Sequence, residues 1–406
     1  MLLSEFDYEL PEELIAQLPA DKRENSRMLV LERGSHTISH KHFYDIVDLI
    51  ENDTLLVLND TKVMPARLIG HKDTGAKIEV FLLKNITPRP LRNKGNRRGK
   101  SLVTLFPEAE RSGEREEVQL EPDNKNKAKV RTSGEGFVSE QTANTDEPFW
   151  EVLIKPSKRV KPETIITISD ELSVRAIERT EEDGGWIVEL IYEGNLLEVL
   201  HRNGNIPLPP YIERKLADED IKKLDFERYQ TVYAKDEGSV AAPTAGLHFT
   251  QEILQKLKDK GVEIAYVTLN VGLGTFRPVK CENILEHKMH SETFEISEET
   301  ARKINEAKAQ GKKITAVGTT TVRTLETAYQ QFGEIKACHS ASELFIYPPY
   351  EFKVIDNLIT NFHLPKSTLL MLVSALAGKD FIFEAYKQAV ENKYRFFSYG
   401  DCMFIK

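Results

Sequence analysis

The segment GSVAAPTAGLHFT, residues 238–250, organises the prediction of the fold. Its first nine residues are nearly all small and offer little to anchor a core, whereas small residues let a ligand approach the backbone closely. His248 and Phe249 then add a titratable ring and an aromatic face. Thr250 is suited to cap a helix over residues 251–259, and a loop that ends at a helix N-terminus suits a polar ligand. A tight turn with a core histidine explains the segment about equally well.

Downstream of this segment, strands and helices alternate. The pattern predicts strands at 262–269, 313–317 and 358–362 and helices at 298–310, 322–331 and 368–377. Such alternation is typical of a mostly parallel sheet with helices on both faces. We therefore expect an α/β fold, with a large three-layer α/β domain.

Upstream, the sequence changes to short strands separated by Gly, Pro, Asn and Asp, which is typical of a small antiparallel barrel. Residues 85–148 are low in hydrophobicity, so we expect a flexible insertion there at a hairpin tip. The proline-rich segment IPLPPYIERK, residues 206–215, is suited to connect an inserted domain back to the first domain. The expected domains are an α/β domain from residues 1–67 and 194–406 and a β-barrel domain from residues 68–193.

The composition indicates a cytoplasmic protein. Of the 406 residues, 29% are charged and 40% are apolar, which is ordinary for a soluble domain. The three cysteines are far apart and form no CxxC pair, which argues for a reducing compartment and against a thiolate zinc site. The acidic N-terminus does not resemble a signal peptide, and the longest apolar run, residues 368–377, is too short to span a membrane.

The net charge of −9 argues against a nucleic-acid partner, but the charges are unevenly distributed. Residues 84–100 hold seven basic side chains and no acidic one. Such a run can meet phosphates whatever the total charge is. On composition alone, a solvated loop is the more ordinary explanation.

Three unusual loops follow the predicted strands of the C-terminal half. NVGLGTF spans residues 270–276, GTTTVR spans 318–323 and HLP spans 363–365. In a parallel sheet all three share the carboxyl rim, where ligands bind. GTTTVR places hydroxyls and an arginine at a helix N-terminus and so suits a carboxylate or phosphate, although a simple capped helix explains it too. NVGLGTF lacks the GxGxxG order, so a dinucleotide cofactor is not expected.

Histidines in or near the loops are candidate acid or base groups. His248, His287, His290 and His363 are the candidates, although a lone histidine is more often structural. HKMH, residues 287–290, has no third ligand at a recognisable spacing, so no metal site is expected. Lys62 and Arg67 flank a strand-to-loop junction and suit an anionic ligand, or are simply surface charge.

Six ordered segments resemble one family. They are GSVAAPTAGLHFT, VTLNVGLGTFRPV, HKMHSETFEI, AVGTTTVRTLE, TNFHLPKSTLLMLVSALAG and YRFFSYGDCMFIK. Together with FDYELPEELIAQ, NDTKVMPARL and IPLPPYI, they are similar to the S-adenosylmethionine:tRNA ribosyltransferase-isomerase family of queuosine biosynthesis. The similarity covers residues 3–406 except the insertion, and it implies a large α/β domain with an inserted barrel.

The resemblance also implies the reaction. The ribosyl part of S-adenosylmethionine is transferred to 7-aminomethyl-7-deazaguanine at the wobble position of a tRNA with a G-U-N anticodon, and it is isomerised to give epoxyqueuosine-tRNA. Adenine and methionine leave. S-adenosylmethionine is a co-substrate, and no cofactor or metal is expected. We also expect a monomer.

The sequence departs from the family pattern at three positions. The family usually has histidine where this chain has Asn270, usually glycine where it has Pro349, and often arginine where it has Lys62. Asn270 cannot shuttle a proton at neutral pH, so that position is not an obligatory acid or base.

The chemistry needs a base for the carbon beside the sulfonium, an acid for departing adenine and groups that orient the substrates. For proton transfer we expect His248, His363 and His290. For substrate binding we expect Lys62, Arg67, Thr244, Gly246, Gly272, Gly274, Thr319, Thr320, Thr321, Arg323, Glu343 and Asp401. Two rivals stay open: a tRNA-binding or nucleotide-binding module without catalysis, and a transferase that acts on a free deazapurine nucleoside.

Overall fold

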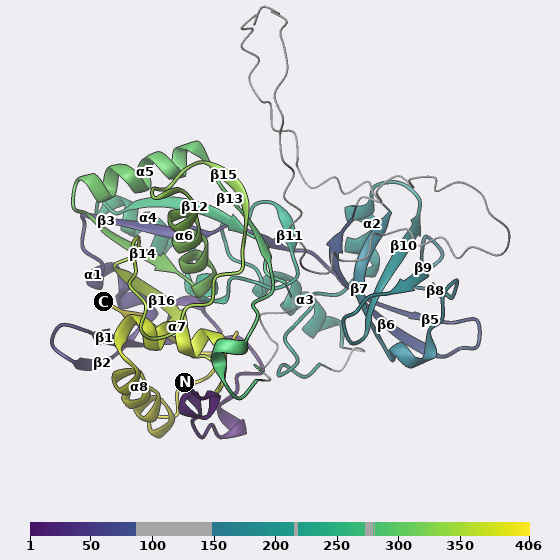
Figure 1. Cartoon of the computed structure of the whole chain (residues 1–406), viewed down its shortest axis with the longest axis horizontal. Coiled ribbons are helices and arrows are strands. Elements are labelled where there is room, and N and C mark those ends of the chain that lie inside the picture. Colours follow the sequence, from purple (N-terminus) through teal and green to yellow (C-terminus); the bar gives the residue numbers. More distant parts are fainter. Residues whose placement is uncertain (87–147, 215–217, 273–278, 280) are drawn as a thin grey trace, which may run out of the picture.

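The computed structural model describes residues 1–86, 148–214, 218–272, 279 and 281–406. Most of the expected insertion, residues 87–147, therefore lies outside the described residues. The rest forms a large α/β domain and a smaller β-barrel, on the left and right of Figure 1. Every helix in the described part of the chain is too short or too polar to span a bilayer.

Within the described residues, the α/β domain is built on nine strands in the order β15-β13-β12-β3-β14-β16-β17-β1-β2. Their bounds are Arg27–Glu32 (β1), Thr37–His42 (β2), Thr54–Asn59 (β3), Glu263–Leu269 (β12), Glu292–Ile296 (β13), Lys313–Val317 (β14), Cys338–Ser342 (β15), Asn357–Asn361 (β16) and Cys402–Ile405 (β17). The strands β12, β3, β14 and β16 are mutually parallel.

The flanks of the sheet differ from the mostly parallel arrangement that we expected. β13 pairs antiparallel with β12 and β15. β17, the last strand of the chain, inserts antiparallel to β16 and parallel to β1. The sheet is therefore mixed, with a parallel centre. The predicted α/β class and the inserted barrel are confirmed.

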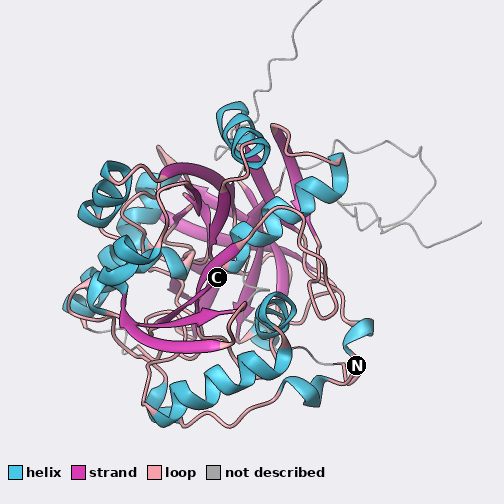
Figure 2. Cartoon of the chain, turned by 90° about the vertical axis from the view of Figure 1, so that its left-hand side faces the viewer, coloured by secondary structure: helices cyan, strands magenta, loops and turns pink. Residues whose placement is uncertain are grey.

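Alternating side chains of the central strands build the three layers. On β3, Leu55 and Val57 join the core on one face of the sheet, while Leu56 and Leu58 join the core on the other. Helices α5, α6, α7 and α8 cover the first face, and α1 and α4 cover the second. This alternation of buried side chains is what a sheet covered on both faces requires. Figure 2 shows the strands in magenta with the helices in cyan around them.

Most helices of the described residues begin directly after a residue whose side chain caps them. Their bounds are Ile46–Leu49 (α1), Leu196–Asn203 (α2), Glu219–Arg228 (α3), Gln251–Asp259 (α4), Glu298–Ala309 (α5), Thr319–Phe332 (α6), Thr368–Ala377 (α7) and Lys379–Glu391 (α8). Short 3-10 helices span Leu3–Phe6 (η1), Glu12–Leu14 (η2), Arg23–Asn25 (η3), Phe43–Asp45 (η4), Ser157–Arg159 (η5), Thr244–His248 (η6) and Ile284–Glu286 (η8). The Thr250 hydroxyl accepts a hydrogen bond from the backbone N–H of Ile253 at 3.2 Å, so the predicted cap and the helix over residues 251–259 are confirmed.

Helix α6 begins three residues earlier than predicted. Gly318 follows β14 with φ of 86°, a conformation that favours glycine, and the helix starts at Thr319. The threonines therefore form the first turn of the helix instead of a loop before it.

The barrel is closed by the strands β5 (Arg67–His71), β6 (Lys77–Asn85), β7 (Phe149–Lys155), β8 (Ile165–Thr167), β9 (Leu172–Arg179) and β10 (Gly185–Tyr192). Alternate residues such as Ile78, Val80 and Leu82 fill its interior. Helix α2 packs Leu196 and Val199 against that core. A two-stranded parallel sheet of β4 (Lys62–Val63) and β11 (Glu237–Ser239) completes the strands of the described residues.

Candidate functional site

A pocket opens at the carboxyl ends of β14 and β16, close to the end of β12. Its described lining consists of residues 242–245, 318–320, 360–364 and 397–398 with Tyr211, Val271, Ser367 and Leu369. We call it the rim pocket. Because β12, β14 and β16 belong to the parallel centre of the sheet, their loops share one rim, as predicted. The described lining contains no Asp, Glu, Lys or Arg.

The start of helix α6 contributes two of the three expected threonines. Thr319 and Thr320 line the pocket, and the hydroxyl of Thr320 accepts a hydrogen bond from the Asn59 amide at 3.4 Å. Thr321 turns away, because its hydroxyl donates to the carbonyl of Val317 at 2.7 Å. The N-terminal turn of α6 therefore faces the pocket with two hydroxyls and its backbone N–H groups.

His363 is the predicted histidine that lines the rim pocket. Its Nε2 lies 2.9 Å from the Thr360 hydroxyl. Its backbone is held on both sides, since Tyr8 donates to its carbonyl at 2.6 Å and its N–H donates to Tyr386 at 2.8 Å. Burial lowers the pKa of His363 to about 3, so the ring is neutral at pH 7.

His248 lies next to the pocket but does not line it. It packs against Phe43, and its Nδ1 lies 2.9 Å from the Ser26 hydroxyl. Burial is the main reason that the pKa of His248 falls to about 4, and interaction with Asn361 partly offsets this shift. The ring is therefore neutral at pH 7, mainly because it is buried.

Several pocket residues were missed by the sequence analysis. Asn361 ends β16 and contacts both His248 and the pocket. Tyr211 reaches the pocket from the proline-rich segment and hydrogen-bonds Ser398 at 2.7 Å. The position of Asn361 could have revealed it. It is a polar residue at the carboxyl end of a predicted central strand, next to one of the loops that the sequence analysis selected.

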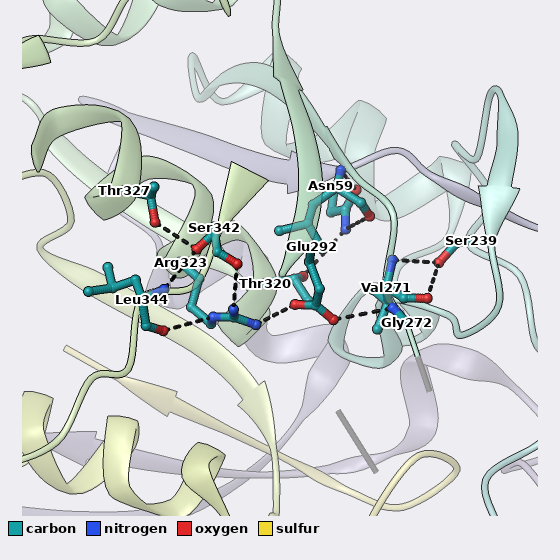
Figure 3. A network of polar contacts seen from close by, with 11 residues as sticks. Asn59, Ser239, Val271, Gly272, Glu292, Thr320, Arg323, Thr327, Ser342 and Leu344 are labelled. Carbon is teal, nitrogen blue, oxygen red and sulfur yellow. Dashed lines mark hydrogen bonds and ion pairs between the residues drawn. The ribbon is translucent and has the colours of Figure 1, made fainter. Parts of the chain in front are cut away.

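Arg323 does not face the pocket, contrary to the expected substrate contact. Its guanidinium forms a buried ion pair with Glu292 and donates to the carbonyls of Leu344 and Ser342, each at 3.2 Å (Figure 3). The Glu292 carboxylate in turn accepts the backbone N–H of Gly272 at 3.2 Å. These bonds join α6 to β13, to the last residue of β15 and to the chain that follows it, so the structure gives Arg323 a structural role.

Two further expected cations lie away from the rim pocket. Lys62 forms an ion pair with Glu237 at 2.8 Å. Arg67 begins the first barrel strand and forms an ion pair with Glu79. Neither lines the rim pocket. Both lie near the junction of the two domains, and their contact with a substrate stays a prediction.

The expected acidic residues and the third histidine also lie elsewhere. Asp401 is buried and accepts the backbone N–H groups of Arg27 and Arg395 at 2.9 and 2.8 Å, which ties the C-terminal loop to β1. Glu343 and His290 are exposed and do not line the rim pocket.

The expected glycines have different surroundings. Gly246 is buried in η6, where an added Cβ would collide with the Tyr233 hydroxyl. Gly272 donates its N–H to Glu292, and Gly274 lies outside the described residues. Thr244, at the start of η6, lines the rim pocket as expected.

A family model described as a queuosine biosynthesis protein matches residues 3–405. The chain belongs to this family. It is 46% identical over 406 residues to the S-adenosylmethionine:tRNA ribosyltransferase-isomerase of Halothermothrix orenii and 48% identical over 408 residues to that of Acetivibrio thermocellus, with full coverage of all chains. A crystal structure of an S-adenosylmethionine tRNA ribosyltransferase from Thermotoga maritima is 35% identical and covers 99% of this chain and 100% of its own, with a TM-score of 0.48.

The queuosine biosynthesis family confirms the resemblance seen in the sequence, and the enzyme class is that of a transferase-isomerase. Five of the six segments that carried this resemblance converge on the rim pocket. They supply Val271 and residues 242–245, 318–320, 360–364 and 397–398, which are distant in sequence and adjacent in the structure. Asn270, where the family resemblance expects histidine, instead accepts a hydrogen bond from Thr61 at 2.8 Å.

Proposed function

We propose that this chain transfers and isomerises the ribosyl moiety of S-adenosylmethionine onto 7-aminomethyl-7-deazaguanine at the wobble position of tRNA. Epoxyqueuosine-tRNA, adenine and methionine are the products. The names of the relatives support S-adenosylmethionine and tRNA as substrates. The observation that carries the proposal is the convergence of five family segments on the rim pocket.

The walls of the rim pocket suit S-adenosylmethionine. Phe362, Leu364 and Phe397 offer apolar surface for the adenine and the ribosyl ring, and threonine hydroxyls offer hydrogen bonds. The described lining carries no Lys or Arg that would repel the sulfonium. The N-terminal turn of α6 suits the methionine carboxylate.

For proton transfer we propose His363, because it is the candidate histidine that lines the rim pocket. Its neutral ring is the form that a base needs to remove a proton from the carbon beside the sulfonium. His248 lies behind Asn361 and supports the pocket wall. We propose that no metal takes part.

The test is product release by the purified protein with S-adenosylmethionine and either tRNA bearing the aminomethyl base or the free nucleoside. We expect adenine and methionine to be released in equal amounts without added metal. The release should occur with the tRNA substrate and not with the free nucleoside. Equal turnover on the free nucleoside would favour the second rival. Binding of both substrates without adenine release would favour the non-catalytic module, and loss of activity with a chelator would contradict the metal-free reaction.

A further inference from the structure

One polar group in the rim pocket is left without a well-formed hydrogen bond. Asn361 is 3% exposed and lines the pocket. Its amide nitrogen donates to the carbonyl of Phe397 at 3.0 Å. Its Oδ1 is buried and has no hydrogen-bond partner among the described residues. Because a buried acceptor without a donor is costly, this atom marks a place for a ligand donor.

The orientation of this amide is fixed by the loop that follows α8. Phe397 adopts φ of 70°, and its carbonyl also accepts the backbone N–H of Gly400 at 2.9 Å. Rotating the Asn361 amide by half a turn would set its oxygen against the Phe397 carbonyl oxygen. The amide therefore keeps its oxygen as the unpartnered atom.

His248 does not provide the missing donor. The Ser26 hydroxyl donates to the Arg23 carbonyl at 3.1 Å, so Nδ1 of His248 is the donor to Ser26. In a neutral ring Nε2 then carries a lone pair, and it also has no partner among the described residues. Asn361 and His248 thus present two acceptors, which is why Asn361 raises the pKa of the ring against the effect of burial.

An amino group with a neighbouring acceptor is the ligand that fits this amide. The Asn361 nitrogen donates one N–H to the carbonyl of Phe397, and the structure shows no acceptor for the second N–H among the described residues. An acceptor oxygen beside a donor N–H is the pattern with which asparagine recognises the amino group and N7 of adenine. The uncharged lining suits a neutral base better than an ammonium group.

We propose that Asn361 is a specificity-determining residue that recognises the adenine of S-adenosylmethionine, with Oδ1 accepting from the C6 amino group and Nδ2 donating to N7. This inference rests on the proposed function. It places the adenine beside Phe397, with the ribosyl group extending toward His363 and α6.

The first test uses the unmodified protein and calorimetric titration with three ligands. S-adenosylmethionine should bind roughly tenfold to a hundredfold more tightly than S-inosylmethionine, in which an oxygen replaces the amino group. The 7-deaza analogue of S-adenosylmethionine should also bind more weakly. Equal affinity for S-adenosylmethionine and S-inosylmethionine would overturn the proposal, whatever any variant does.

The second test compares Asn361→Ala with Asn357→Ala, at the other end of β16. Asn357 bonds Thr315 at 3.2 Å and does not line the rim pocket. In Asn361→Ala the preference for S-adenosylmethionine over S-inosylmethionine should collapse, and in Asn357→Ala it should persist. If Asn361→Ala keeps the preference for S-adenosylmethionine, the proposal is overturned. This includes the case in which the variant binds both ligands more weakly by the same factor, because such a result indicates a purely structural role for Asn361.

The adenine-release assay separates this inference from the proposed function. A protein that releases adenine from S-adenosylmethionine but binds both ligands equally keeps its function and loses this inference. A protein that binds no S-adenosylmethionine loses both.

Discussion

His363 combines a fixed backbone with a neutral ring in the rim pocket. We expect His363→Ala to lower turnover about a hundredfold or more, the usual scale for general acid-base help, because a proton acceptor is removed from the reacting atoms. Binding of S-adenosylmethionine should change much less. His363→Asn keeps a hydrogen bond to Thr360 but cannot take up a proton, so steady-state kinetics of this variant separates proton transfer from positioning. If His363→Asn turns over like the parent, the histidine only positions its neighbours.

The two buried histidines also make stability depend on pH. Burial lowers the pKa of His363 to about 3 and that of His248 to about 4, from 6.5. As pH falls below 6.5 the unfolded chain takes up these protons first. The stabilisation is therefore fully present above pH 6.5 and is lost as pH falls toward 3, by up to about 1.4 kcal/mol per pH unit for each histidine.

Urea unfolding between pH 7 and pH 4.5 measures this dependence. The free energy of unfolding of His363→Asn should fall less steeply with pH than that of the parent, since one of the two histidines no longer titrates. Carboxylates contribute to both curves, so the difference between the slopes is the relevant quantity. Parallel curves would show that His363 is protonated equally easily in the folded and unfolded states.

Arg323 shows that a local sequence pattern does not determine which partner a side chain contacts. The sequence GTTTVR predicted that its hydroxyls and its cation act together at a helix N-terminus. In the structure Thr319 faces the pocket, while Arg323, one turn further along α6, pairs with Glu292. Glu292 comes from β13, and no local signal reveals that this strand lies beside α6. Asn361, by contrast, was available from its position at a strand end.

At the scale of elements, η6 contributes to the lining of the rim pocket and packs closely against its neighbours. Gly246 leaves room for the Tyr233 ring, whose hydroxyl is buried without a hydrogen-bond partner among the described residues. We expect Gly246→Ala to lower the free energy of unfolding by roughly 1–3 kcal/mol, because the added methyl meets that hydroxyl. Urea denaturation provides the measurement.

The matched control removes the hydroxyl instead of the glycine. Tyr233→Phe alone should be close to neutral, since it deletes a group that has no partner among the described residues. Combined with Gly246→Ala it should recover part of the loss, because the methyl group of Thr231 still lies 2.8 Å from the added Cβ. Additive losses in the double variant would show that the Tyr233 hydroxyl is not the contact that limits space at Gly246.

Element boundaries were predictable where capping chemistry is local. Thr250 and Ser367 accept N–H groups of the helices that follow them, and the bounds of α4 and α7 agree with the prediction. The order of the strands was less accessible. β17 pairs with β16 and β1 through contacts between distant parts of the chain, so the mixed character of the sheet could not be read from the alternation of strands and helices.

At the scale of the whole molecule, the ends of β6 and β7 allow a test of the insertion. Asn85 pairs with Trp150, and the N–H of Ile86 donates to the carbonyl of Phe149 at 2.9 Å. A variant that lacks residues 87–147, closed by a short Gly-Ser linker, should therefore keep a folded barrel, because its ends are already neighbours. Its melting temperature should stay within a few degrees of the parent value.

The same variant tests the basic run of residues 89–100. If these side chains contact phosphates, the KM for tRNA should rise and its dependence on salt should become flatter, while the affinity for S-adenosylmethionine holds. Kinetics at several salt concentrations would show this. An unchanged salt dependence would leave the basic run as a solvated loop.

The central claim is that the rim pocket binds S-adenosylmethionine. A crystal structure of the protein soaked with S-adenosylmethionine tests it most directly. We predict adenine against Asn361, the ribosyl ring near His363 and the methionine carboxylate at Thr319 and Thr320, at the start of α6. Binding at another place, such as the cleft beside Arg67 at the domain junction, with the rim pocket empty, would contradict the account.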